Sequence, residues 1–157
     1  MVGSVYLAQF LLDGLYLSGE ADAALDIMTS DGLRSWVNML KLNATLTGEA
    51  WDPSIKPNTS FSHPWATAPA NVILRGLFGI VPLEPGFAHF QIKPQPGSLE
   101  WAKLTTPSIK GPISSRWERT DAGLELAVPI PPNSRATVSL PTFGTPAPSH
   151  SMLRTPV

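Results

Sequence analysis

The first fifty residues place apolar side chains at the three- to four-residue spacing of α-helices. In the first segment this spacing joins Val5, Ala8, Leu11, Leu12 and Leu15. It predicts a helix that begins near residue 5 and ends at Gly19, because glycine commonly follows the last helical turn. Two further helices are predicted over residues 21–28 and 33–40, with a Ser-Asp-Gly turn between them. Three short helices cannot cover their own apolar faces, so we expect other helices to pack against them.

A fourth helix is predicted over residues 65–78, after a loop over residues 42–62 that is rich in Thr, Pro, Asn and aromatic residues. Its apolar positions are Val72, Ile73, Leu77 and Phe78. Pro69 offers an alternative start, since proline suits the first helical turn. Gly79 is the expected end of this helix.

After residue 82 the pattern changes to an alternation with a period of two. Strands are predicted over residues 87–92, 99–105, 113–119, 124–128 and 136–140. In the third of these, the apolar residues Ile113 and Trp117 occupy odd-numbered positions. Odd and even positions of a strand point to opposite faces, so one face is expected to be buried and the other solvated. Five short strands at this regular spacing predict an antiparallel sandwich.

The proline distribution divides the chain near the same place. All 17 prolines follow Trp51, and so abrupt a shift indicates two architectures in one chain. We therefore predict an α+β chain in two segments, an all-α segment over residues 1–82 and an antiparallel β-sandwich over residues 83–141. The stretch 142–157 has Pro, Ser and Thr with little pattern and is expected to be disordered.

Charge and composition argue against several functions. The formal net charge is −1, and the Lys and Arg residues are scattered, so no nucleic-acid partner is expected. No apolar run reaches the roughly 18 to 20 residues that cross a bilayer, so no membrane partner is expected either. The chain has no cysteine, which excludes disulfides, thiolate metal sites and thiol nucleophiles. We expect neither a metal nor a cofactor, and composition leaves the compartment open.

The loop from residue 48 to residue 65 gathers the residue types that sugar hydrolysis uses. Its members are Glu49, Trp51, Asp52, Asn58, Phe61, His63 and Trp65. Hydrolysis of a glycosidic bond needs two carboxyl groups, and aromatic faces pack well against the C–H groups of a sugar. Burial beside aromatic rings can raise the pKa of a carboxyl group, which suits base catalysis.

Each of these residues also has an ordinary structural interpretation. A loop glutamate such as Glu49 is usually solvated or caps a helix, and a histidine before a proline, as at His63, usually makes structural hydrogen bonds. Trp51 and Trp65 belong to a residue type found more often in a core than under a sugar. Asp52 is a good turn former. From the residue types alone, the structural interpretation of Glu49 is the stronger one.

The order of several short motifs changes this weighting. They are Ser-Asp-Gly-Leu-Arg-Ser-Trp-Val-Asn-Met at 30–39, Gly-Glu-Ala-Trp-Asp at 48–52, Lys-Pro-Asn at 56–58, Ser-His-Pro-Trp at 62–65, Ala-Pro-Ala-Asn at 68–71, Gly-Ile-Val-Pro-Leu-Glu-Pro-Gly-Phe at 79–87 and Ile-Lys-Pro-Gln-Pro-Gly at 92–97. Over about residues 4–140 they resemble the bacterial α-L-rhamnosidases of glycoside hydrolase family 78. In that family this region passes from the end of a catalytic (α/α)6 six-hairpin barrel to a C-terminal β-sandwich.

The resemblance implies an inverting hydrolase that removes terminal α-L-rhamnose from rhamnosides, with a base carboxylate that activates water. Glu49 matches the family's general base, and His63 matches its active-site histidine, a ligand of sugar hydroxyls. Trp51 and Trp65 are the aromatic residues expected near the sugar. Gly48 departs from the family pattern, because many members carry a bulkier residue before the glutamate.

The family's general acid has no counterpart in this sequence, and four helices supply only part of a twelve-helix barrel. We therefore expect a C-terminal fragment, from a truncated or split gene, that is inactive or nearly so alone and needs the missing N-terminal part of the barrel as its partner. Two alternatives stay open. One is a non-catalytic module that binds carbohydrate or a partner, with Trp101 and Trp117 as sugar platforms. The other is a fragment of another (α/α)6 glycosidase, acting on glucosides or trehalose.

Overall fold

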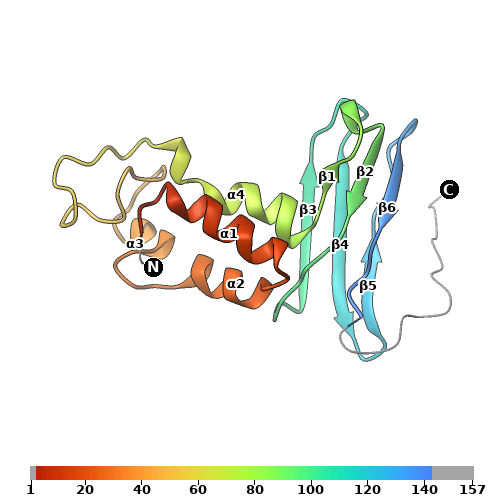
Figure 1. Ribbon diagram of the computed structural model, residues 1–157, viewed down its shortest axis with the longest axis horizontal. Helices are drawn as coiled ribbons and strands as arrows, with labels where there is room; N and C mark the ends of the chain where they lie inside the picture. The colour runs from red at the N-terminus through yellow and green to blue at the C-terminus, as the bar shows by residue number, and fades with distance from the viewer. Residues whose placement is uncertain (1–2, 143–157) are drawn as a thin grey trace. The chain divides into compact units, whose positions relative to one another are not determined.

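The computed structural model describes residues 3–142. Its contacts divide the chain into two compact units, Met1–Ile73 and Leu74–Val157, which we call the helical unit and the strand unit. Helices make up the first and strands the second (Figure 1). This order confirms the predicted α+β fold class, although the units meet at Ile73 and Leu74 and the sequence predicts the domain change at residue 82. The tail predicted over residues 142–157 lies, apart from Thr142, outside the described residues.

The helical unit contains three helices close to their predicted positions. They are α1 (Leu7–Leu17), α2 (Ala21–Thr29) and α3 (Trp36–Lys41). Gly19 follows α1 with a φ of 81°, a left-handed conformation that favours glycine, so the predicted helix end is confirmed. Helix α3 starts three residues later than predicted, because the side chain of Ser35 caps it by accepting a hydrogen bond from the backbone N–H of Asn38.

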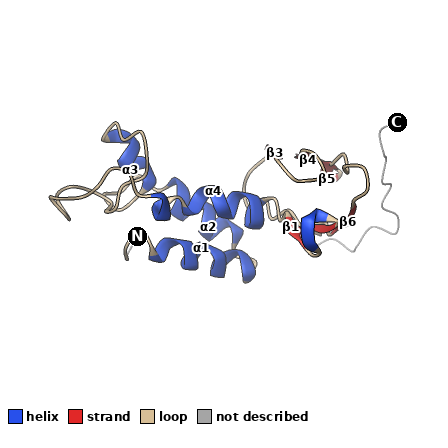
Figure 2. Ribbon diagram, turned by 90° about the horizontal axis from the view of Figure 1, so that it is seen from above, coloured by secondary structure: helices blue, strands red, loops and turns tan. Residues whose placement is uncertain are grey.

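The core of the helical unit is formed where α1 packs against α2 and α4 (Ala68–Val72), which lie beside it in both views (Figures 1 and 2). Its buried side chains include Ala8, Leu12, Tyr16, Ala24, Leu25, Trp36, Met39, Trp51, Ala66 and Val72. The indole rings of Trp36 and Trp51 meet edge to face, with centroids 5.0 Å apart. Loop residues therefore complete a core that the short helices begin.

The segment predicted as one helix over residues 65–78 consists of three short pieces. A 3-10 turn, η1 (Pro64–Ala66), precedes α4, and a π-helical turn, η2 (Ile73–Leu77), follows it. Thr67 separates the first two pieces with a φ of −90° and a ψ of 31°, and Pro69 stands in the first turn of α4. The alternative start at Pro69 was thus closer to the observed start of α4.

Gly79 ends this segment, as predicted, with a φ of 63°. A Cβ atom at this position would lie 2.0 Å from the backbone oxygen of Lys93. The backbone N–H of Lys93 also donates to the oxygen of Gly79 at 3.2 Å. Only glycine at position 79 allows its backbone to lie so close to the backbone of Lys93.

The strand unit holds two three-stranded sheets, which Figure 2 shows as two layers. One has the order β1-β2-β6, with β1 at Val81–Pro82, β2 at His89–Ile92 and β6 at Arg135–Val138; the 3-10 turn η3 (Pro85–Phe87) joins β1 to β2. The other has the order β3-β4-β5, with β3 at Trp101–Thr106, β4 at Ile113–Thr120 and β5 at Gly123–Ala127. All five predicted strands are present, whereas the two-residue strand β1 was not predicted.

The strand pairing is antiparallel with one exception. Strand β6 runs parallel to β2, with His89 opposite Arg135. The alternation predicted for β4 is confirmed, because Ile113, Ser115 and Trp117 are buried. Trp117 packs against Phe78, with ring centroids 6.0 Å apart, so β4 forms the centre of the sandwich core.

Candidate active site

Residues 47–63 of the helical unit form a hairpin-like loop that we call the base loop. The backbone N–H of His63 donates to the oxygen of Thr47 at 2.8 Å, and the hydroxyl of Thr47 donates to the oxygen of His63 at 2.7 Å. Two residues further along, the N–H of Glu49 donates to the oxygen of Ser60 at 2.8 Å. These bonds fix Glu49 and His63 on the two sides of one stem, so the structure brings two predicted site residues together.

The Glu49 carboxylate is ionised at neutral pH. It forms an ion pair with Lys56 and accepts a hydrogen bond from the backbone N–H of Ser60 at 3.2 Å. The bond from Lys56 and then the bond from Ser60 lower the pKa of Glu49, and the nearby His63 adds a smaller effect in the same direction. An ionised carboxylate can accept a proton from water but cannot donate one, so the ionisation of Glu49 permits the role of base, although its lowered pKa makes it a weaker one.

The pKa of Glu49 is lowered overall and not raised as the sequence suggested, because the hydrogen bonds from Lys56 and Ser60 outweigh the smaller opposing effect of burial. About a third of its side chain is exposed (34%), and the neighbouring cation dominates its ionisation. Lys56 was missed as its partner, although the Lys-Pro-Asn motif that contains it was part of the resemblance. In the sequence, Lys56 is related to Glu49 only by a spacing of seven residues. That spacing does not predict a contact unless the chain is known to turn at Asp52. There the backbone N–H of Ser54 donates to the Asp52 carboxylate at 2.8 Å, which confirms Asp52 as a turn former.

His63 and Trp65 extend the site into an aromatic cluster. Their rings lie 6.0 Å apart, and the ring of Trp65 lies 5.2 Å from that of Tyr6, which stands just before α1. Trp65 is 67% exposed, so its ring is available to a ligand. Tyr6 was not predicted as a site residue, because nothing in the sequence relates it to a tryptophan almost sixty positions later.

Trp51 occupies a different environment from Trp65. Only 2% of it is exposed, and its indole N–H donates to the backbone oxygen of Gly3 at 2.8 Å. The amide of Asn38 donates to the backbone oxygen of Trp51 at 3.1 Å. These contacts favour a role in supporting the base loop, and contact between Trp51 and sugar stays a prediction.

Gly48 is buried beside the base. A Cβ atom there would lie 2.9 Å from the backbone oxygen of Ala50. A larger residue before Glu49 would therefore require the loop to shift. This close packing of the backbone explains why glycine is needed at this position, where the resemblance implies that many family members carry a bulkier residue.

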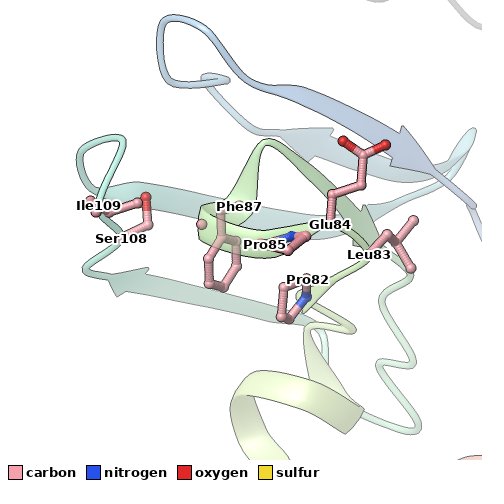
Figure 3. Close-up of a pocket in the computed structure, with 8 residues that line it drawn as sticks. Pro82, Leu83, Glu84, Pro85, Phe87, Ser108 and Ile109 are labelled. Atoms are coloured by element: carbon pink, nitrogen blue, oxygen red, sulfur yellow. The ribbon is translucent and has the colours of Figure 1, made fainter.

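The strand unit contains a hollow of about 560 Å³, and among the described residues that line it Glu84 is the one with an ionisable side chain. Figure 3 shows the rings of Pro82 and Phe87 on one side of it and the Glu84 carboxylate extending away from them. That carboxylate is paired with Arg135. Of the two strand tryptophans, Trp101 is exposed on the outer face of β3 and Trp117 is fully buried, so only Trp101 is accessible to a sugar.

Within residues 3–142, no group of three or more His, Asp or Glu side chains is arranged to hold a metal ion. None of the helices described there is long and apolar enough to span a membrane.

Each of the two units matches a known family of protein domains. Residues 1–77 match the bacterial α-L-rhamnosidase six-hairpin glycosidase domain, and residues 79–149 match the bacterial α-L-rhamnosidase C-terminal domain. The two matches follow one another along the chain, in the order that the resemblance predicted. The chain belongs to the bacterial α-L-rhamnosidase family.

Individual relatives of this chain agree with the family match. An α-L-rhamnosidase of Streptomyces avermitilis is 30% identical over 140 residues. A crystal structure of the Streptomyces avermitilis α-L-rhamnosidase complexed with L-rhamnose superposes with a TM-score of 0.74 at 28% identity, covering 83% of this chain and 14% of that one. The native α-L-rhamnosidase of Aspergillus terreus superposes with a TM-score of 0.76 at 30% identity, covering 85% of this chain and 17% of that one.

The chain spans only a small part of the length of these relatives. It covers 83% of its own length but 14% of the Streptomyces avermitilis protein. The matched part is the end of the six-hairpin domain and the C-terminal domain that follows it. The fragment prediction is therefore confirmed in its coarser form, as a match to the C-terminal region of a glycoside hydrolase.

Proposed function

We propose that this chain supplies the base side of an inverting glycoside hydrolase that removes terminal α-L-rhamnose from rhamnosides. The observation that carries the proposal is the stem of the base loop, which holds an ionised Glu49 and His63 on opposite sides through Thr47. The family match and the likeness to a rhamnose-bound relative support the choice of sugar. Glu49 is the general base, and His63 and Trp65 bind the substrate.

The proposed reaction is a single displacement at the anomeric carbon of rhamnose. Glu49 removes one proton from a water molecule while the oxygen of that water forms a bond to the anomeric carbon. The bond to the leaving oxygen breaks on the opposite face, and a general acid outside residues 1–157 protonates that oxygen. Glu49 must be ionised at the start of this step, as a glutamate is at neutral pH; the hydrogen bonds from Lys56 and Ser60 stabilise that carboxylate and thereby weaken it as a base.

The two substrate contacts follow from exposure and chemistry. The imidazole of His63 can donate to or accept from a sugar hydroxyl. The exposed ring of Trp65 can pack against the C–H face of a sugar or another ring. We assign Trp51 a supporting role, since its buried indole ties the loop to Gly3.

Alone, residues 1–157 are proposed to be inactive or nearly so. The chain carries the proposed base but lacks the general acid that works with it. Each such group commonly contributes about 10²- to 10⁴-fold in rate. Helices of the remaining barrel, in the same or in another chain, are the proposed partner that completes the site. An assay of the purified chain with 4-nitrophenyl α-L-rhamnoside tests this, and robust turnover would refute it.

A chimera tests the base itself. Residues 7–140 of this chain replace the matching segment of the Streptomyces avermitilis relative, and the chimera is assayed with and without Glu49→Gln. We expect Glu49→Gln to reduce kcat by about 10²-fold or more, with the fold checked by circular dichroism. The matched control is Glu118→Gln, which alters an exposed carboxylate of the strand unit and should leave kcat unchanged. Near wild-type activity of Glu49→Gln, or an inactive but folded parent chimera, contradicts the proposal.

A further inference from the structure

The side chain of Asn38 ties helix α3 to the segment that directly follows the proposed base. Its amide donates to the backbone oxygen of Trp51 at 3.1 Å and to the carboxylate of Asp52 at 2.8 Å. Asn38 lies in the first turn of α3, where its own backbone N–H is held by the N-cap residue Ser35. A capped helix therefore fixes the backbone and one side chain of the base loop, within three residues of Glu49.

Asp52 organises the turn that carries Lys56. Its carboxylate accepts a hydrogen bond from the backbone N–H of Ser54 at 2.8 Å, and its backbone oxygen accepts one from the N–H of Lys56 at 3.3 Å. An aspartate that binds the backbone two residues later is a typical turn former. The turn brings the side chain of Lys56 back to Glu49, seven residues earlier, where the two form an ion pair.

The ion pair depends on this turn for its geometry. Both partners are partly exposed, Lys56 to 39% and Glu49 to 34%. A pair of this kind stabilises little by itself, because holding a long lysine side chain in one place costs conformational entropy. A fixed backbone at Lys56 reduces the freedom that the side chain must lose. The carboxylate of Asp52 uses separate oxygens for Ser54 and Asn38, so it joins the turn to the helix.

From this series of contacts we infer that Asn38 and Asp52 are positioning residues for the general base and act through Lys56. The inference rests on the proposed function, because it assigns what holds the carboxylate that activates water. Asp52 holds the turn, and the turn keeps the ammonium group of Lys56 against the carboxylate of Glu49. Orientation matters at this step, since a misplacement of about 1 Å can cost about 10²-fold in rate.

The direction of a pKa change separates this role from a direct electrostatic effect. The negative charge of Asp52 by itself would raise the pKa of Glu49, so Asp52→Ala would then lower that pKa. If Asp52 acts through Lys56, Asp52→Ala releases the cation and raises the pKa of Glu49 instead. The other groups that lower this pKa, the N–H of Ser60 and His63, are unchanged in every variant. ¹³C NMR titration of the Glu49 carboxyl group in the full chain measures the direction.

A comparison of single and double variants tests whether Lys56 is the link. Lys56→Met is expected to raise the pKa of Glu49, and Asp52→Ala should add no further rise in the Lys56→Met background. Asp31→Ala is the matched control, because Asp31 is an exposed aspartate of the same unit that pairs with Lys41. It should leave the pKa of Glu49 unchanged. If Asp52→Ala does not fold, Asp52→Asn gives the same comparison with a smaller change of shape.

An exchange of the two side chains tests the contact between helix and turn. Asn38→Asp removes the donor and Asp52→Asn removes one of two acceptor oxygens, whereas the double variant again places an amide opposite a carboxylate. In the chimera we expect each single variant to lower kcat about tenfold with KM changed less than about threefold. The double variant should recover part of the loss in kcat.

Three results overturn the inference. They are a lowered or unchanged pKa of Glu49 in Asp52→Ala, a further rise when Asp52→Ala is added to Lys56→Met, and no recovery of kcat in the exchanged variant. The titration needs no turnover, so it can fail while Glu49 remains the base. Conversely, normal activity of Glu49→Gln in the chimera would refute the proposed function and leave the measured link between Asp52 and Lys56 intact.

Discussion

The helical unit and the strand unit differ in how completely each covers its own apolar surface. Their described parts are similar in length, yet twelve of the sixteen large apolar side chains exposed among the described residues belong to the helical unit. The strand unit leaves four exposed, Leu83, Trp101, Ile109 and Leu140. Exposed apolar surface of this kind is typical of a part that other helices cover, which is what we propose for the helical unit.

The difference teaches that compactness and completeness are separate properties. Both units bury several side chains completely, among them Leu12 in α1 and Trp117 in β4. Two sheets bury their apolar faces when they pack against each other, and two short sheets are enough for that. The short helices of the helical unit cover only part of their apolar side chains, several of which stay exposed, such as Leu7, Leu11 and Leu17 in α1.

The largest expected effect tests the closed core of the strand unit. Trp117→Ala removes a fully buried ring that packs against Phe78, and we expect it to lower the free energy of unfolding by about 3–5 kcal/mol. Trp101→Ala, on the outer face of the same sheet, should change it by less than about 0.5 kcal/mol. Urea unfolding followed by circular dichroism measures both. Similar losses in the two variants would contradict the assignment of the core.

The next effect tests the open face of the helical unit within one helix. Leu12→Ala empties a fully buried position of α1 and should cost about 2–5 kcal/mol. Leu17→Lys changes a side chain that is 88% exposed and should leave stability within about 0.5 kcal/mol. It should also reduce binding of an apolar dye, because it removes part of the uncovered surface. A large loss of stability in Leu17→Lys would mean that the face is already covered.

A smaller effect concerns the start of α3, which positions the base loop through Asn38. Ser35 accepts from the N–H of Asn38 at 3.0 Å and donates to the backbone oxygen of Gly32 at 2.7 Å. We expect Ser35→Ala to cost about 1 kcal/mol of unfolding free energy, the usual value of a lost N-cap, and Ser35→Thr to cost less because it keeps the hydroxyl. Thermal unfolding compares the two. Equal losses would show that the hydroxyl is not the cause.

The smallest effect is the pH dependence produced by the ion pair of Lys56 and Glu49. The pKa of Glu49 is lowered in the folded chain from its ordinary value of 4.5, so the pair stabilises the fold above that pH. The contribution is lost as pH falls through the lowered pKa. Lys56→Met should raise the pKa of Glu49 and flatten the pH dependence of stability below the ordinary value. Carboxyl NMR titration and urea unfolding check this, and identical profiles in both proteins contradict it.

The sequence predicted most of the regular elements because local signals specify them. Gly19 and Gly79 end their segments through a backbone conformation that favours glycine, and alternation in β4 reports one buried face. The parallel pairing of β6 with β2 could not be predicted, because pairing direction depends on the path of the chain between distant strands. The division of residues 64–77 into three pieces also escaped, since their apolar spacing is close to that of one helix.

The candidate site divides in the same way. Glu49, His63 and Trp65 were found through ordered motifs, and the structure brings them into one loop and one aromatic cluster. Trp51 and Trp65 are both tryptophans, but Trp51 is buried in the core and Trp65 is exposed. The residue type alone does not predict this difference in burial. Tyr6 and Lys56 reach the site through tertiary contacts, which a single sequence does not reveal.

The stem of the base loop has a consequence for how such proteins can diverge. Thr47 and His63 join its two ends, and the turn between residues 52 and 59 projects beyond the bonds that fix Glu49. Insertions and deletions in that turn would lengthen or shorten the tip while the stem kept its register, but they would also move Lys56, the ion-pair partner of Glu49. Variation of loop length can therefore reshape what surrounds the bound glycoside while the proposed base and its histidine neighbour keep their spacing.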